Sequence, residues 1–187
     1  PEVKYVGNSA SNIDGQGLAG TEVYKNHLDR SMTVTTILFG SNDVYRYTEK
    51  TPVLQWTITT DKKNIHGYMC LKACTNYHGR SFVAWFTPEI PIPNGPWKFG
   101  GLPGLILQVY DSQNHYIFDC DGIQYLKTKK TIEEFNVKYT DVSRASLNNL
   151  IKRLHLNFDL YIQAQGIKHV RGSQKNLSFP YNPIELE

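Results

Sequence analysis

The segment that decides the fold is "NGPWKFGGLPGLILQVYD", residues 94–111, in which a loop rich in glycine and proline runs directly into strand-forming residues. Phosphate-binding glycine loops run from a strand into a helix, whose N-terminus holds the phosphate. This loop runs into a strand instead, and its glycine spacing matches neither the dinucleotide fingerprint nor the phosphate loop. We therefore exclude a nucleotide site here.

The loop extends upstream, and five of the nine prolines lie within residues 88–103. Proline fixes φ and lacks a backbone donor, so the segment is stiff and cannot join a central sheet ladder. A stiff loop presents aromatic side chains at little entropic cost on binding, which makes Trp97, Lys98 and Phe99 candidate contacts for a ligand or partner. The alternative is that the same aromatic rings close the end of a sheet, and the sequence leaves both open.

On both sides of this loop the pattern predicts β-structure. About eight short extended segments alternate with turn residues between residues 33 and 125, as in an antiparallel meander. The expected strands lie at 33–40, 42–49, 56–59, 65–77, 81–87, 105–110, 115–120 and 123–125, and one expected turn lies at 61–64.

Helical periodicity occurs only late in the chain. Ser143 is a plausible N-cap, and apolar residues recur after it with helical spacing, which predicts a helix over about 143–156. The predicted fold class is mainly β or α+β, a strongly curved antiparallel sheet with one or two C-terminal helices packed on it. We expect an irregular lead-in at 1–30, one domain at 31–166 and an extended tail at 167–187.

Composition narrows the classes of partner. The net charge of the 187 residues is only +3, and the basic residues are scattered among acidic ones, so a nucleic-acid partner is not expected. No run of 18 apolar residues occurs, so no transmembrane segment is expected. The sequence begins at Pro1 without a signal peptide, which we interpret as a trimmed or a mature form.

The three cysteines leave the redox state open. Cys70 and Cys74 on one strand would lie about 13 Å apart, too far for a disulfide. Either could pair with Cys120 if the sheet curves enough, so one bridge and free thiols are both compatible with the sequence. His66, Met69 and these cysteines are soft metal ligands, but strand alternation places Met69 on the opposite face. We predict no metal and no cofactor.

The quoted loop also carries a resemblance. "GLPGLI" at 101–106, "WTIT" at 56–59, "KNIHGYMCLKA" at 63–73 and "NPIEL" at 182–186 resemble the layout of the GLPGLI family, secreted or envelope proteins of Bacteroidetes-type bacteria. This resemblance implies a periplasmic or surface-exposed protein, and it supplies no agreed activity and no functional residues. The segment from Ile65 to Ala73, followed by "AWF", is also similar to lipoprotein-carrier domains, curved half-barrels that hold an acyl chain.

From these observations we expect an exported, non-catalytic binding module whose partner is a hydrophobic small molecule or an envelope protein. The expected contact residues gather around the Pro/Gly loop and on the strand before it: Trp85, Phe86, Glu89, Trp97, Lys98, Phe99 and Leu102. The alternative is an envelope hydrolase that uses polar side chains around the same loop, with Lys98, Glu89, His78 and His115 as candidates.

Overall fold

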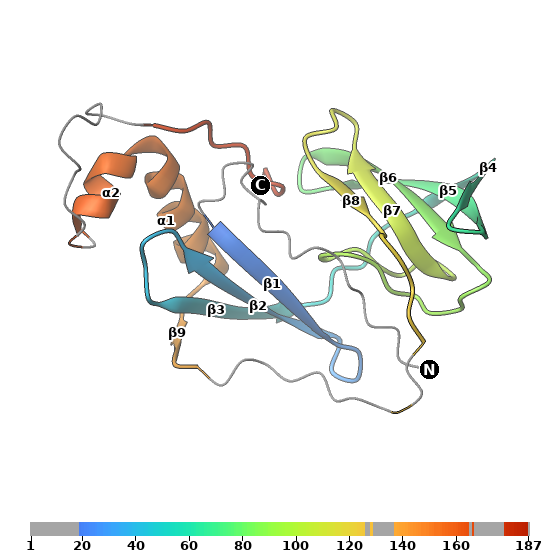
Figure 1. The fold of residues 1–187 in the computed structure, drawn as a ribbon, viewed down its shortest axis with the longest axis horizontal. Coiled ribbons are helices and arrows are strands. Elements are labelled where there is room, and N and C mark those ends of the chain that lie inside the picture. Colours follow the sequence, from blue (N-terminus) through green and yellow to red (C-terminus); the bar gives the residue numbers. More distant parts are fainter. Residues whose placement is uncertain (1–18, 126–127, 129–136, 165, 167–177, 187) are drawn as a thin grey trace. The chain divides into compact units, whose positions relative to one another are not determined.

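The computed structural model describes residues 19–125, 128, 137–164, 166 and 178–186 (Figure 1). Contacts within the chain group it into two compact units. The first, here called the loop unit, contains Thr51–Glu133 and Ile184–Glu187, and the second, the helical unit, contains Ala10–Lys50 and Glu134–Pro183. The chain thus enters the helical unit twice, and its last residues belong to the loop unit.

The helical unit contains a four-stranded sheet of order β1-β2-β3-β9. Strands β1, β2 and β3 are antiparallel neighbours, and β9 pairs parallel with β3. The strands are β1 (Ala19–Asn26), β2 (Ser31–Leu38), β3 (Val44–Lys50) and β9 (Tyr139–Asp141), and the helices are α1 (Arg144–Leu156) and α2 (Phe158–Ala164).

Both helices pack on this sheet through apolar side chains. Leu147 of α1 lies in a cluster with Val34 and Tyr47, and Leu154 shares a second cluster with Leu38. The predicted N-cap is confirmed, because the Ser143 hydroxyl accepts a hydrogen bond of 3.0 Å from the Ser146 amide. No helix in the described part of the chain has the length and apolar character needed to cross a bilayer.

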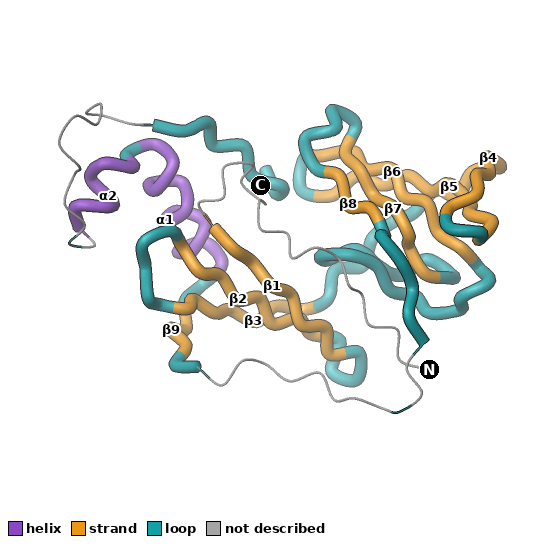
Figure 2. Tube along the Cα trace, viewed as in Figure 1, coloured by secondary structure: helices purple, strands orange, loops and turns teal. Residues whose placement is uncertain are grey.

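The loop unit contains a five-stranded antiparallel meander of order β4-β5-β6-β7-β8. Its described residues consist of strands and loops, without a helix, as Figure 2 shows. The strands are β4 (Thr57–Ile65), β5 (Tyr68–Tyr77), β6 (Arg80–Thr87), β7 (Leu105–Asp111) and β8 (Ile117–Asp119).

The mainly β fold class with helices after the strands is therefore confirmed. The strands divide between two sheets, whereas the sequence predicted one continuous curved sheet. Residues 19–26 form strand β1 although we expected an irregular lead-in there. Residues 184–186, expected in an extended tail, are grouped with the loop unit.

The turn between β4 and β5 differs from the prediction. The sequence predicted a turn at residues 61–64, but β4 continues through these residues with an irregular register. The chain reverses instead at His66 and Gly67, both of which have positive φ, 52° and 87°. Two-residue hairpin loops favour this backbone geometry because it matches the twist of the strands, so the His-Gly pair determines the turn.

The Pro/Gly loop, residues 88–104, connects β6 to β7 and packs on one face of the five-stranded sheet. Phe82, Ala84 and Phe86 of β6 are buried and alternate with more exposed residues. We call this side the inner face. Phe99 and Leu102 of the loop are also buried, and the Phe99 ring lies 4.8 Å from that of Phe82.

The loop rejoins the sheet through a very close backbone approach at Gly104. A Cβ atom at this position would lie 2.2 Å from the carbonyl oxygen of Thr87 and 3.0 Å from the Cα atom of Pro88. These are backbone atoms, which cannot rotate away as a flexible side chain could. The amide of the next residue, Leu105, donates a hydrogen bond of 2.9 Å to the Ile90 carbonyl, which holds the chain beside this contact.

We expect Gly104→Ala to lower the free energy of unfolding by at least about 2 kcal/mol, because the added methyl group overpacks this contact. Urea denaturation of the full chain measures the effect. Gly122→Ala is the matched control, since a Cβ there meets nothing within 4 Å. Equal unfolding midpoints for the two variants would contradict the close approach of Gly104 to the backbone of Thr87.

Candidate functional site

Three of the expected contact residues lie in the core of the loop unit. Phe86, Phe99 and Leu102 have 0%, 0% and 1% of their surface exposed. The Phe99 ring also lies 6.0 Å from that of Phe118 in β8. A ligand on the surface would not touch these side chains, so their aromatic and apolar character serves packing under the loop.

Trp97 is half-buried beside this core. Its ring lies 5.3 Å from Phe99 and 5.9 Å from Tyr77, both within the range of favourable aromatic pairs. Its φ is 46°, which is uncommon for a bulky residue and indicates that surrounding contacts hold it in place. Trp97 therefore belongs mainly to the packing of the loop.

Lys98 forms a buried ion pair with the C-terminal segment. Its ammonium lies 2.8 Å from the Glu185 carboxylate, and the two side chains are 2% and 8% exposed. The Tyr77 hydroxyl donates to the same carboxylate at 3.1 Å, and the Leu186 amide donates to the His78 carbonyl at 2.9 Å. These contacts attach residues 184–186 to the hairpin of β5 and β6.

Because the pair is buried, the stability of the fold depends on both partners. Removing one partner of a buried pair leaves a charge without compensation in a medium that solvates it poorly. Glu185 was missed by sequence reasoning because 87 residues separate it from Lys98. The segment "NPIEL" was part of the family resemblance, but no periodic pattern connects it to the loop.

A second buried ion pair supports the end of β7. Arg80 and Asp111 lie 3.2 Å apart with side chains 5% and 2% exposed. The other carboxylate oxygen of Asp111 accepts a hydrogen bond of 2.8 Å from the Tyr116 amide, which orders the turn into β8. His115 lies 3.4 Å from the Arg80 guanidinium through its Nδ1 atom, so it joins the edge of this pair.

The polar side chains proposed for hydrolysis are held by different partners. Lys98 pairs with Glu185, whereas Glu89 is exposed and accepts a hydrogen bond of 2.8 Å from the Met69 amide. The His78 ring packs edge-on against Tyr77, with ring centroids 4.4 Å apart. His115 lies beside the Arg80 pair. These contacts thus give the four side chains separate structural roles.

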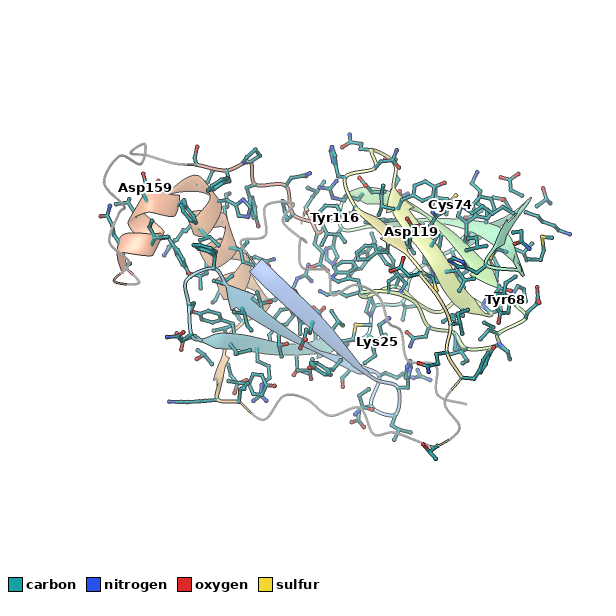
Figure 3. The ribbon with its side chains drawn as sticks, viewed as in Figure 1. Lys25, Tyr68, Cys74, Tyr116, Asp119 and Asp159 are labelled. Atoms are coloured by element: carbon teal, nitrogen blue, oxygen red, sulfur yellow. The ribbon has the colours of Figure 1, made fainter. Side chains whose placement is uncertain are left out.

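The opposite side of the five-stranded sheet carries a second set of side chains, which we call the open face. Strand register aligns Cys74 with Val83, Tyr110 and Ile117 in one row across β5 to β8, and Trp85 with Gln108 and Asp119 in the next. Ile117 is 54% exposed and Asp119 is exposed, while the other five residues are half-buried. Figure 3 labels Cys74 and Asp119 on these strands.

A polar network crosses the open face. Lys63 donates to the Gln108 side-chain carbonyl, and its ammonium lies 4.6 Å from the centre of the Trp85 ring. Gln108 in turn donates through its amide nitrogen to Asp119. The ammonium of Lys63 thus lies over the face of the Trp85 ring, a position in which a cation is attracted to the ring.

A charged pair lies at the margin of the same face. Lys72 and Asp61 lie 3.0 Å apart, and both side chains are partly exposed. The hydrogen bond and charge of Lys72 hold the pKa of Asp61 below its usual value, and Asp61 correspondingly raises the pKa of Lys72. The pair therefore stays charged over the physiological pH range. The open face thus carries an apolar row with Val83, Tyr110 and Ile117, and beside it a row in which Trp85 lies between Lys72 and Gln108.

All three thiols are free in the structure. Cys70 and Cys120 are buried, and Cys74 is half-buried on the open face. Burial raises the pKa of the Cys70 thiol to about 11. Among the described residues, no group of three His, Cys, Asp or Glu side chains is arranged to hold a metal ion.

The central part of the loop unit matches a known protein family. Residues 75–108, from the end of β5 through the loop into β7, match the model of a family described as "Protein of unknown function (Porph_ging)", an uncharacterised family of Bacteroidetes-type bacteria. The match includes the loop quoted at the start and part of the open face. No curated protein matches the chain.

Two solved structures of PNGF-II share the fold. In space group P21 the TM-score is 0.58 with 16% sequence identity over 76% of this chain. In space group C2 it is 0.56 with 15% identity over 72% of this chain. This chain spans only 27% and 25% of the length of those chains. Such low identity shows a common fold and carries no information about activity.

We expect Lys98→Met to lower the free energy of unfolding by about 3 kcal/mol, because it leaves the Glu185 carboxylate buried without its ammonium. Thermal or urea denaturation of the full chain measures this. The double variant Lys98→Met, Glu185→Leu should recover most of the loss, since both charges are then absent. Lys72→Met, at the partly exposed pair with Asp61, is the control and should change little. A Lys98→Met variant as stable as the parent chain would contradict the buried pair.

Proposed function

We propose that this chain is an exported, non-catalytic binding module of the GLPGLI type and that its open face binds an envelope protein. The observation that carries the proposal is the arrangement of side chains on that face. Val83, Trp85, Tyr110 and Ile117 form its centre. Aromatic residues are enriched in protein interfaces, where apolar contacts are combined with hydrogen bonds.

The aromatic residues give this face its capacity for binding. Trp and Tyr contribute disproportionately to binding energy when they are held rigidly. The Lys63 ammonium lies over the Trp85 ring, and Tyr110 lies on β7, which is paired on both sides, with β6 and with β8. The solvated face of an antiparallel sheet usually carries polar residues. The apolar centre therefore suggests that a partner covers this face for part of the protein's life.

The charged side chains of the open face favour a protein partner over a small hydrophobic ligand. Lys63, Lys72, Asp61 and Asp119 place both signs of charge beside these apolar side chains. Such a face suits a partner with complementary charged side chains, whereas an acyl chain offers nothing to these groups. Of the two loop aromatics expected to contact a ligand or partner, Phe99 lies in the core and Trp97 is half-buried beside it.

The comparisons support a module without assigning an activity. The family matched at residues 75–108 has no known function. The same fold forms about a quarter of the PNGF-II chain, so it also occurs as part of a longer polypeptide. Export to the periplasm or cell surface rests on the resemblance of "GLPGLI" and its flanking segments to secreted proteins. We do not favour the hydrolase alternative, because its candidate residues are held by different partners.

The proposal predicts a specific cross-link from the open face. A photoreactive phenylalanine analogue at Tyr110, in the full chain expressed in cells of the native type, should link to one envelope protein upon irradiation. The same analogue at Val53, which is 85% exposed in the loop unit, is the matched control and should not give that adduct.

Binding of the purified partner then tests the face directly. Ile117→Glu places a charge in the apolar centre and should weaken binding at least about tenfold. The variant should keep the melting temperature of the parent chain, because the Ile117 side chain is half exposed. Identical adducts from both photoreactive positions, or unchanged affinity of the Ile117→Glu variant, would overturn the proposed face.

A further inference from the structure

Two of the three thiols are enclosed by the same apolar side chains. Cys70 on β5 and Cys120, directly after β8, are 0% and 8% exposed. Both lie in one cluster with Leu105 and Leu107 of β7. Cys74 lies four residues further along β5, on the same face of the strand as Cys70, and is half-buried. The fold thus separates the cysteines into a buried pair and a single, more accessible thiol.

The two buried thiols lie on or next to strands that are not neighbours in the sheet. Strands β5 and β8 are three positions apart in the sheet, a separation of about 14 Å if the sheet were flat. The His66 ring, at the turn that precedes β5, nevertheless contacts the carbonyl oxygen of Cys120 through its Nε2 atom. The start of β5 and the end of β8 therefore approach each other, and Cys70 lies four residues beyond His66.

The environment of the pair also determines when it can react. Burial is the main cause that raises the pKa of both thiols. The charge interaction with Cys120 raises the pKa of Cys70 further. The thiolate is the reactive form of cysteine. In the folded chain both thiols are therefore protonated and shielded, so oxidation has to take place during folding, before the cluster closes.

We propose that Cys70 and Cys120 form an intramolecular disulfide when the chain folds in an oxidising compartment. One cysteine thiolate attacks a sulfur of a disulfide oxidant, such as oxidised glutathione or the disulfide of a thiol oxidoreductase, and releases one oxidant thiolate. The second cysteine thiolate then attacks the protein sulfur of this mixed disulfide and releases the other. Two electrons and two protons pass to the oxidant in total, and Cys74 remains a thiol.

The bond would stabilise the curved sheet. It would link β5 to the residue after β8 and enclose the Pro/Gly loop between them, which restricts the unfolded chain more than the folded one. It would also fix the curvature that the His66 contact with Cys120 already indicates. The disulfide thus adds a covalent connection where the structure shows only side-chain packing and one hydrogen bond.

Refolding with peptide mapping tests this proposal. The full chain is refolded from denaturant in a mixture of reduced and oxidised glutathione, alkylated, digested without reduction and analysed by mass spectrometry. We expect a peptide that links Cys70 to Cys120, with Cys74 alkylated. The oxidised chain should melt about 10 °C above the reduced one.

Single variants provide the controls. Cys74→Ser should keep both the linked peptide and the redox-dependent rise in melting temperature, whereas Cys70→Ser and Cys120→Ser should each abolish both. A link that includes Cys74, or three alkylated cysteines after refolding in oxidised glutathione, would overturn the proposal. This assay does not depend on where the chain resides in the cell, so its outcome is independent of the proposed export.

Discussion

The close passage of Gly104 over the backbone of Thr87 is the constraint on which the loop unit depends. It allows the chain to leave β6, form the long proline-rich loop and pair again with the end of β6 as β7. The excursion places Phe99 and Leu102 over the inner face, where they complete the core. A side chain at position 104 would separate the two strands at the point where the loop begins and ends.

This constraint also determines where function can lie. The loop packs on the inner face, where Phe99 is buried and Trp97 is half-buried. On the opposite face Ile117 is exposed, and Trp85 and Tyr110 are half-buried. The Lys98 pair with Glu185 adds a second restraint on the loop, because it holds the C-terminal segment against the β5–β6 hairpin. The loop thus defines the fold, and the strands beneath it supply the candidate surface.

Local features were predictable from the sequence. Helical spacing of apolar residues after Ser143 identified α1, and short turns between alternating segments identified the meander. The turn at 61–64 was wrong because the left-handed backbone available to His66 and Gly67 decided the hairpin. The pairing of Lys98 with Glu185 and the division into two sheets depend on contacts between distant residues, for which one sequence offers no periodic signal. Whether the loop aromatics faced a ligand or the core was undecidable for the same reason.

Amide hydrogen exchange of the full chain tests most directly whether the Pro/Gly loop is part of the core. The amides of Phe99 and Ile106 donate to the carbonyls of Pro96 and Asn94, both at 3.0 Å. They should exchange as slowly as the amides of β6, through unfolding of the whole loop unit. Exchange of these two amides at the rate of an unstructured peptide, while β6 stays protected, would show that the loop lies free of the sheet and would contradict the account.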